Sequence, residues 1–313
     1  MLDITARQET MIGLRFRLSL FGPFRLAGPA GRIELGSRKL AALFAFLACA
    51  GPEPQPRDAV MTLLWGSSPQ PKAQQSLRQA LMRLRRILGD DAIVGGRDRV
   101  GIRPGLVDCD VAAFERLIAT GAHGDALQLH AGPFLANVSL DEEEWAAWAR
   151  AQQGRLDALA LDAAVTLSAA ELDAGRWPRA LEAAQRALAI DNLREDAHRL
   201  VIAALAAGGR RADAFKHFED LTALLKSELD VTPEPETRRL AQQIRLSAGV
   251  AAAPASAPAC DPAPPPERPS IAVLPFADAS ETDQRWFADG IVEDIVLSLA
   301  SLHELKAITV PFH

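Results

Sequence analysis

Side chains that can recognise nucleic acid bases are concentrated in residues 73–88, AQQSLRQALMRLRRIL. Arginine can bind guanine O6 and N7 with two parallel hydrogen bonds, glutamine can pair with adenine, and both can bind phosphate. No acidic residue interrupts this segment. On a helix, one face would carry Gln75, Arg78, Gln79, Met82, Arg83 and Arg86. This face is a candidate surface for DNA.

The same segment must also be held in place by a core. Leu77, Leu81, Leu84 and Leu88 follow the spacing i, i+4, i+7, i+11, which predicts an amphipathic helix with its leucines buried. Ala80 and Ile87 widen this apolar stripe. A basic helix face is also common on ordinary solvated surface, so the segment alone leaves both interpretations open.

The surrounding elements favour DNA binding. Residues 14–35 alternate apolar and polar side chains between Gly and Pro turns, which predicts short strands in a meander. Ser37 lies at an N-cap position before a buried helix over 38–50, and a second helix is predicted over 57–65. Strands followed by three helices and a hairpin describe a winged helix, which we assign to residues 1–105.

The hairpin is predicted over residues 92–102, where two short β segments flank a Gly-Gly-Arg-Asp turn. Its arginines, Arg97 and Arg99, would be ordinary surface charges in isolation. Directly after a helix that enters the major groove, they are placed to reach the adjacent DNA backbone.

Charge is distributed unevenly along the chain, whose net charge is −6. Residues 1–105 contain 16 Lys and Arg against 8 Asp and Glu, whereas the remaining residues contain 18 against 32. A basic module of this size is typical of a domain that binds a polyanion, and the acidic remainder is not.

The middle of the chain, residues 106–246, is rich in alanine and predicted to be helical. Ser139 and Glu142 have the spacing of a capping box ahead of a long helix over 145–170. An internal repeat follows with a 34-residue offset, the period of tetratricopeptide helix pairs. The repeat matches Gly175, Trp177 and Ala180 with Gly209, Arg211 and Ala214. Such stacked pairs form scaffolds for partners and have no intrinsic chemistry.

The C-terminal part divides into a linker and the start of another domain. Residues 247–269 are rich in Ala and Pro, which predicts an extended linker. Within residues 270–313, SIAVLPF, WFADGIVEDIVLSLASL and LKAITV predict a strand, a helix and a strand. This β-α-β segment is too short to enclose a core, so we expect an incomplete α/β domain.

Several function classes have no support in the sequence. There is no phosphate-binding loop or nucleophile motif, and the six histidines lack metal-ligand spacing, so we expect no enzyme activity, cofactor or metal. The three cysteines are far apart, and no signal peptide or membrane-spanning run is evident. These features predict a cytoplasmic protein without a membrane partner.

Three segments in the first 105 residues resemble the OmpR-like winged helix of SARP-type bacterial transcriptional activators: SRKLAALFAFLA, DAVMTLLWG and QQSLRQALMRLRRILG. The middle of the chain is similar to the bacterial transcriptional activator domain that accompanies it. That similarity rests on Glu195, Arg199, Gly209, Ala214, Leu225, Glu228, Leu229, Pro233 and Leu240. The segment from Arg268 resembles the start of a TolB-like domain, and we expect that domain to be incomplete in this sequence.

The resemblance implies a transcription regulator that binds double-stranded promoter DNA. It implies that residues 73–88 form the recognition helix and 92–102 the wing, and that the helical domain supports homodimerisation, contact with RNA polymerase or contacts between domains. We expect Gln75, Arg78, Gln79 and Arg83 to read DNA, and Arg86, Arg97 and Arg99 to contact its backbone. The alternative is a helical-repeat scaffold whose basic N-terminal domain docks a protein.

Overall fold

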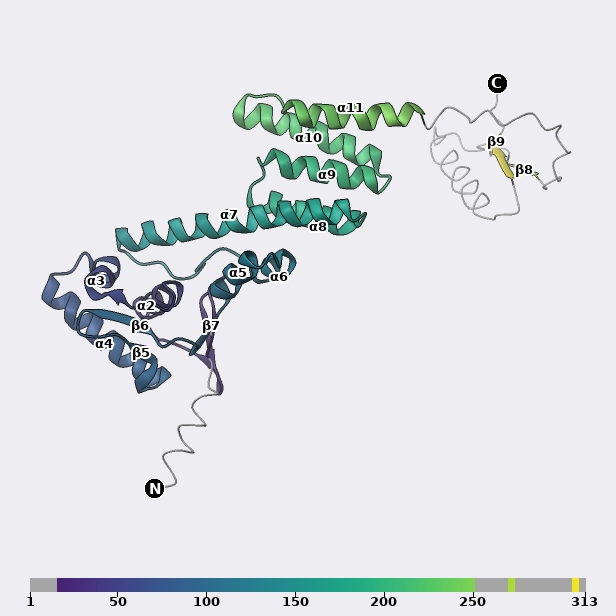
Figure 1. The fold of residues 1–313 in the computed structure, drawn as a ribbon. Helices are drawn as coiled ribbons and strands as arrows, with labels where there is room; N and C mark the ends of the chain where they lie inside the picture. The colour runs from purple at the N-terminus through teal and green to yellow at the C-terminus, as the bar shows by residue number, and fades with distance from the viewer. Residues whose placement is uncertain (1–15, 251–269, 274–305, 310–313) are drawn as a thin grey trace, which may run out of the picture. The chain divides into compact units, whose positions relative to one another are not determined.

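The computed structural model describes residues 16–250, 270–273 and 306–309. The chain separates into two compact units, residues 1–253 and 254–313. The first unit contains two sheets and a long series of helices (Figure 1).

The N-terminal sheet has four strands in the order β3-β2-β1-β7. The strands are β1 (Phe16–Ser19), β2 (Arg25–Gly28), β3 (Gly31–Ile33) and β7 (Val107–Cys109). The first three form the expected antiparallel meander, with Phe16, Leu18 and Leu20 buried in alternation. Strand β7 was not predicted. It pairs parallel to β1, with Val107 opposite Phe16, and lies beyond the expected end of the winged helix at residue 105.

The three helices of the winged helix occur as predicted. They are α2 (Arg38–Cys49), α3 (Arg57–Trp65) and α4 (Gln70–Leu88). Ser37 is the N-cap of α2, although its side chain makes no capping hydrogen bond. Helix α4 begins three residues before the predicted start at 73, because Pro71 is accommodated in its first turn, where no backbone N–H is needed.

The predicted hairpin is formed by β5 (Ile93–Val94) and β6 (Arg99–Ile102), with Ile93 opposite Ile102. It follows a short 3-10 helix, η1 (Asp90–Ala92). A third strand, β4 (Gln55–Pro56), pairs with the other side of β6 and completes a sheet of order β4-β6-β5. The proline-rich connection between α2 and α3 therefore supports the wing, which the sequence did not indicate.

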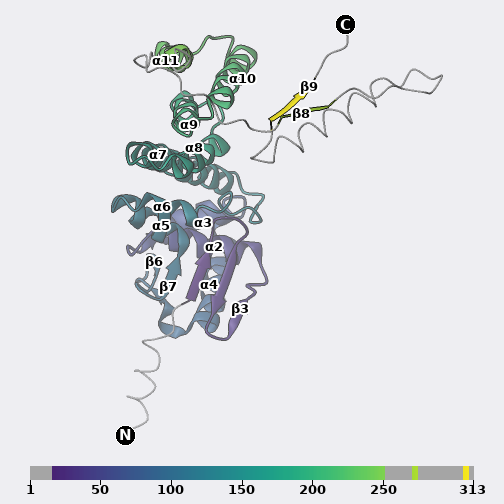
Figure 2. The ribbon, with the colours of Figure 1, turned by 90° about the vertical axis from the view of Figure 1, so that its right-hand side faces the viewer.

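After β7, the described residues up to 250 are mainly helical, and their helices stack in successive antiparallel pairs (Figures 1 and 2). Its helices are α5 (Asp110–Ala119), α6 (His123–Leu129), α7 (Glu143–Asp173), α8 (Trp177–Ile190), α9 (Glu195–Ala207), α10 (Arg211–Leu229) and α11 (Pro235–Val250). The 34-residue repeat is visible in the backbone, because Gly175 and Gly209 both have positive φ, 72° and 76°. Ala180 and Ala214 are both fully buried. The fold is thus mainly helical, with a small α+β part at its N-terminus.

One hydrophobic core joins the winged helix to the first repeat. The core cluster begins at Phe16 and continues through Leu84 of α4 to Trp145 and Leu156 of α7 and Ala197 of α9. A smaller second cluster lies among α8, α9 and α10, around Ile202. The two domains expected from the sequence therefore share buried side chains.

The prediction of a capping box before α7 is wrong. The N-cap of α7 is Glu142 itself, and Ser139 is exposed outside the helix. Glu142 is 93 % buried and accepts three hydrogen bonds from the winged helix, which are described below. The local spacing of Ser139 and Glu142 was outweighed by contacts from distant parts of the chain. Glu143 and Glu144 do occupy the first helical turn, as expected for acidic residues there.

At the other end of the repeat domain, α11 continues to Val250, past the expected boundary at residue 246. Most of the expected linker, residues 251–269, lies outside the described residues. In the second unit, β8 (Ser270–Val273) pairs parallel to β9 (Lys306–Thr309), as a β-α-β segment requires. The helix expected between them lies outside the described residues.

Candidate nucleic-acid interface

Helix α4 separates its side chains into a core face and an exposed face. Leu77, Leu81, Leu84 and Leu88 are buried as predicted, and α4 packs against α2 and α3 through this side. Ala80 is also buried, whereas Ile87 is only half-buried. The core therefore determines which face of α4 is exposed to solvent.

Every residue assigned to the opposite face is exposed. These residues are Gln75, Arg78, Gln79, Met82, Arg83 and Arg86. Lys72 and Gln74 are exposed on α4 as well, and the sequence analysis did not include them. Lys72 could have been found, since it precedes the predicted helix by one residue and no acidic residue lies nearby.

The positive charges of α4 are not neutralised. Within residues 16–246, no carboxylate forms an ion pair with Arg78, Arg83 or Arg86. Asp90 and Asp91 are exposed in η1, directly after the helix ends, and Asp58 of α3 lines a pocket with Gln70 and Ala73 at the start of α4. Acidic residues therefore lie near both ends of α4, and the exposed face between them carries only neutral and basic side chains. Uncompensated guanidinium groups are available to bind phosphate or base edges.

The two arginines of the wing differ in their hydrogen bonding. Arg97 is exposed in the turn between β5 and β6. Arg99 is also exposed, but its Nη1 donates a hydrogen bond to the Pro54 carbonyl at 2.9 Å. The turn itself is held by Arg57 N–H, which donates to the Asp98 carbonyl at 2.9 Å. Gly95 is required there, because an added Cβ would lie 2.5 Å from the Arg99 carbonyl oxygen. Arg97 is thus the freer of the two cations.

The structure places the wing beside the basic helix, since α4 contacts β5. The seven residues predicted to bind DNA therefore lie on two adjacent elements, and all seven are exposed. A helix of this kind, followed by a hairpin, can enter a major groove while the hairpin meets the neighbouring backbone.

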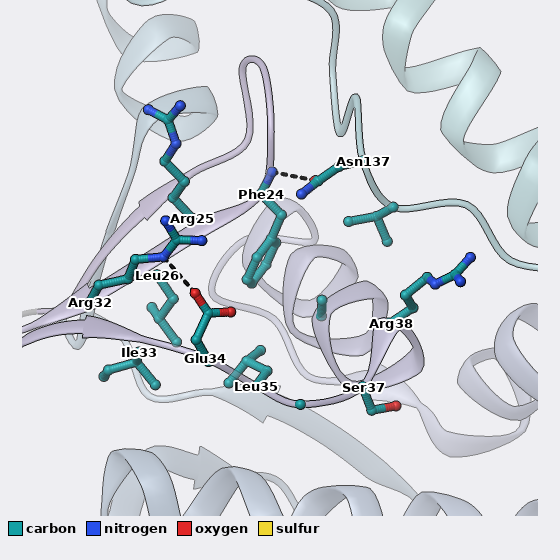
Figure 3. A pocket seen from close by; sticks show the side chains of 13 residues that line it. Phe24, Arg25, Leu26, Arg32, Ile33, Glu34, Leu35, Ser37, Arg38 and Asn137 are labelled. Carbon is teal, nitrogen blue, oxygen red and sulfur yellow. Dashed lines mark hydrogen bonds and ion pairs between the residues drawn. The ribbon is translucent and has the colours of Figure 1, made fainter.

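A second basic region, absent from the sequence analysis, is a pocket of about 350 Å³ between β2, β3 and the start of α2 (Figure 3). Arg25, Arg32 and Arg38 line it, and Arg32 Nε pairs with Glu34 at 2.6 Å. The Asn137 side chain closes one edge by accepting the Phe24 N–H at 2.7 Å. These arginines lie on β2, β3 and α2, and no residue of α4 or of the wing lines the pocket, so the pocket is not part of the candidate DNA surface.

Glu142 joins the repeat domain to the winged helix. Its Oε1 accepts hydrogen bonds from Lys39 Nζ (2.8 Å) and Ser67 Oγ (2.9 Å), and its Oε2 accepts one from Ser67 N–H (3.0 Å). Burial alone would raise the pKa of Glu142, but these donors outweigh burial and lower it. The carboxylate is therefore held in its charged form between α2, α3 and α7.

The remaining sequence expectations concern metals and membranes. Among the residues that the structure describes, no group of three or more His, Cys, Asp or Glu side chains could hold a metal ion. None of the helices described there is both long and apolar enough to cross a bilayer.

Comparison with known proteins places this architecture in a family. Residues 109–245 match the bacterial transcriptional activator domain. The chain is 30% identical over 239 residues to the regulatory protein AfsR of Streptomyces griseus, an alignment that covers 73% of this chain and 24% of that protein. AfsR of Streptomyces coelicolor is 30% identical over 254 residues, covering 76% and 25%. The chain belongs to the SARP-type family of bacterial transcriptional regulators.

This SARP-type chain spans about a quarter of the length of the AfsR proteins that it matches. A solved structure, Mycobacterium tuberculosis EmbR in complex with a low-affinity phosphopeptide, has the same fold with a TM-score of 0.58. EmbR is 18% identical to this chain, and the match covers 94% of this chain and 74% of the EmbR chain. The family membership confirms the resemblance to SARP-type regulators inferred from the sequence.

Proposed function

We propose that this SARP-type regulator binds specific promoter DNA by inserting α4 into the major groove, with the wing on the adjacent backbone. The observation that carries the proposal is the exposed face of α4, whose arginines have no acidic partner among the described residues. Gln75, Arg78, Gln79 and Arg83 would read bases, and Arg86, Arg97 and Arg99 would hold phosphates. The protein would act by binding in the cytoplasm, without catalysis.

A selection of binding sites from genomic fragments, carried out with the full chain at low salt, tests this proposal. A shared sequence motif is expected, with affinity that falls steeply as salt rises, because cations that bind phosphates release counterions from DNA. Recovery of fragments without any shared motif would contradict sequence-specific binding.

Arginine variants then test which residues make the contacts. Arg78→Ala and Arg83→Ala should each weaken binding to the selected site by about 1–3 kcal/mol and relax its sequence preference. Arg86→Ala should instead weaken binding to all sequences similarly and reduce the salt slope by about 1. Arg150→Ala is the matched control, because Arg150 is an exposed arginine on α7, away from α4. Equal losses in all four variants would point to general charge attraction without a specific interface.

We further propose that the repeat domain supplies contacts to partners, either a second copy of the chain or RNA polymerase. Leu229, Val231 and Leu246, near the end of the repeat series, are 53%, 47% and 63% exposed. Exposed apolar side chains that form a contiguous patch commonly mark a site of protein contact. Sedimentation of the full chain with and without DNA distinguishes a dimer from a monomer. If a pulldown instead gave one protein partner without DNA dependence, the scaffold alternative would be favoured.

For the second unit, we propose that residues 270–313 begin a TolB-like domain. The parallel pairing of β8 with β9 agrees with the β-α-β order expected from the sequence.

A further inference from the structure

Met82 is a large apolar side chain in the centre of the basic face of α4. It is 57% exposed, and among the described residues of the winged helix no other large apolar side chain is as exposed. The leucines of the same helix are buried in the core. Nothing in the packing of the winged helix therefore accounts for methionine at this position.

The neighbours of Met82 are groups that can hydrogen-bond to DNA. Arg78 and Gln79 lie one helical turn before it, and Arg86 lies one turn after it. All three are exposed, as is Arg83 beside it. A duplex whose base edges are read by Arg78 and Gln79 would bring a neighbouring base edge towards the thioether of Met82.

The major groove offers one apolar group to such a side chain. Thymine carries a C5-methyl group there, whereas adenine, guanine and cytosine present mainly hydrogen-bonding atoms. Methionine is unbranched and polarisable, so its terminal methyl and sulfur can adjust to a small apolar partner. A polar base edge at the same place would lose water without gaining a hydrogen bond.

We propose that Met82 determines specificity by packing on the C5-methyl of a thymine, between bases or phosphates bound by Arg78, Gln79 and Arg86. This inference rests on the proposed DNA binding and adds one base identity to it. The contact would favour a T·A pair opposite the middle of α4.

Replacement of thymine by deoxyuracil tests the proposal, since it removes only the methyl group. In the highest-affinity duplex from a random-sequence selection with the full chain, each thymine is replaced in turn. The wild-type chain is expected to lose about fourfold in affinity at one position, the value for burial of a single methyl-sized group. Met82→Ala should bind the thymine and uracil duplexes equally at that position.

Two further variants separate this contact from general effects. Met82→Leu keeps an apolar side chain and should retain preference for thymine. Arg83→Ala should lower affinity for both duplexes and leave their ratio unchanged. Circular dichroism of all variants checks folding, which substitution of the exposed Met82 should leave intact.

The outcomes distinguish this inference from the function on which it rests. Equal wild-type binding to all uracil duplexes, or an unchanged thymine preference in Met82→Ala, would overturn the role of Met82 while DNA binding stands. A selected site without thymine opposite α4 would overturn it as well. If the chain selected no sequence at all, the proposed DNA-binding function would fail, and this inference with it.

Discussion

Two carboxylates, buried Glu142 and half-buried Asp110, link the helical part of the chain to its N-terminal part. Glu142 is bound by Lys39 and Ser67 of the winged helix. Asp110 accepts the backbone N–H groups of Leu20 and Phe21, next to the first strand. Burial raises the pKa of Asp110 despite these donors, whereas the pKa of Glu142 is lowered. The two carboxylates therefore contribute to stability with opposite dependence on pH.

Glu142→Gln removes the charge and keeps the shape of the side chain. It should lower the free energy of unfolding by about 1–3 kcal/mol at neutral pH, because charged hydrogen bonds to Lys39 and Ser67 are lost. The folded pKa of Glu142 lies below the ordinary value of 4.5, so its contribution is complete above that value and disappears as pH falls through the lower one. Urea unfolding should give the same difference at about pH 6 and pH 8, and a smaller difference below about pH 4.5.

Comparison with the wild type at each pH cancels the opposite effect of Asp110, which both proteins share. A difference that grew on acidification would contradict the assignment of a charged, stabilising Glu142.

For single residues, the sequence predicted which side chains of α4 are exposed, but it did not predict which residues Glu142 contacts. Helical periodicity alone separated Leu84 from Arg83, and burial confirms the separation. Periodicity could not indicate that Glu142 would contact Lys39 and Ser67, because Lys39 lies 103 positions and Ser67 lies 75 positions before it in the chain. Long-range hydrogen bonds leave no local pattern.

Among the elements, the contact between α8 and the end of α9 depends on a glycine. A Cβ on Gly208 would lie 2.8 Å from the ring of Trp177, at the start of α8. Gly154, in the middle of α7, is exposed and has open space around its Cα. The two glycines therefore have opposite structural roles.

Gly208→Ala should destabilise the chain by about 1–3 kcal/mol, because the indole ring or the backbone must move. Gly154→Ala is the matched control and should stabilise it by about 0.5–1 kcal/mol, since alanine loses less backbone entropy in a helix. Thermal unfolding of the two variants beside the wild type measures both effects. Destabilisation by both substitutions would contradict the close packing of Gly208 on Trp177.

The elements were predicted where their signals are local. Helices α2 and α3 were identified from apolar runs bounded by Ser37, Gly51 and Gly66, and the hairpin from its glycine turn. Strands β4 and β7 were missed because each has only two or three residues and exists through its partner. The 34-residue repeat was found because both of its loops contain a position with positive φ, which favours glycine. Gly175 therefore recurs as Gly209.

For the whole molecule, the shared core predicts coupling between the winged helix and the first repeat. Leu156 of α7 is fully buried in the same cluster as Leu43 and Phe44 of α2. Leu156→Ala should cost about 2–5 kcal/mol and lower the protection of amides in α2 together with those in α7. Hydrogen exchange measured on peptides from both helices tests this coupling.

Ile202→Ala is the matched control, because Ile202 is equally buried but belongs to the second cluster. It should affect α9 and α10 more than α2. Unchanged protection of α2 in Leu156→Ala would mean that the winged helix unfolds independently.

The division at residue 105 was drawn from the change in charge and from the resemblance to separate family domains. Composition reports what a surface binds and does not report which cores are continuous. For this reason the sequence indicated two modules, whereas one cluster of buried residues extends from Phe16 to Ala197 and includes side chains of both.

The parallel pairing of β7 with β1 has a consequence for synthesis of the protein on the ribosome. Phe16 can meet Val107 only after the intervening residues have been translated, and Asp110 can bind Leu20 only after that. The nascent chain can form its β1-β2-β3 meander early, but the four-stranded sheet stays open at β1 until β7 leaves the exit tunnel. Pairing across such long sequence separations is slow. During translation, the basic helix is thus completed before the sheet that supports its domain.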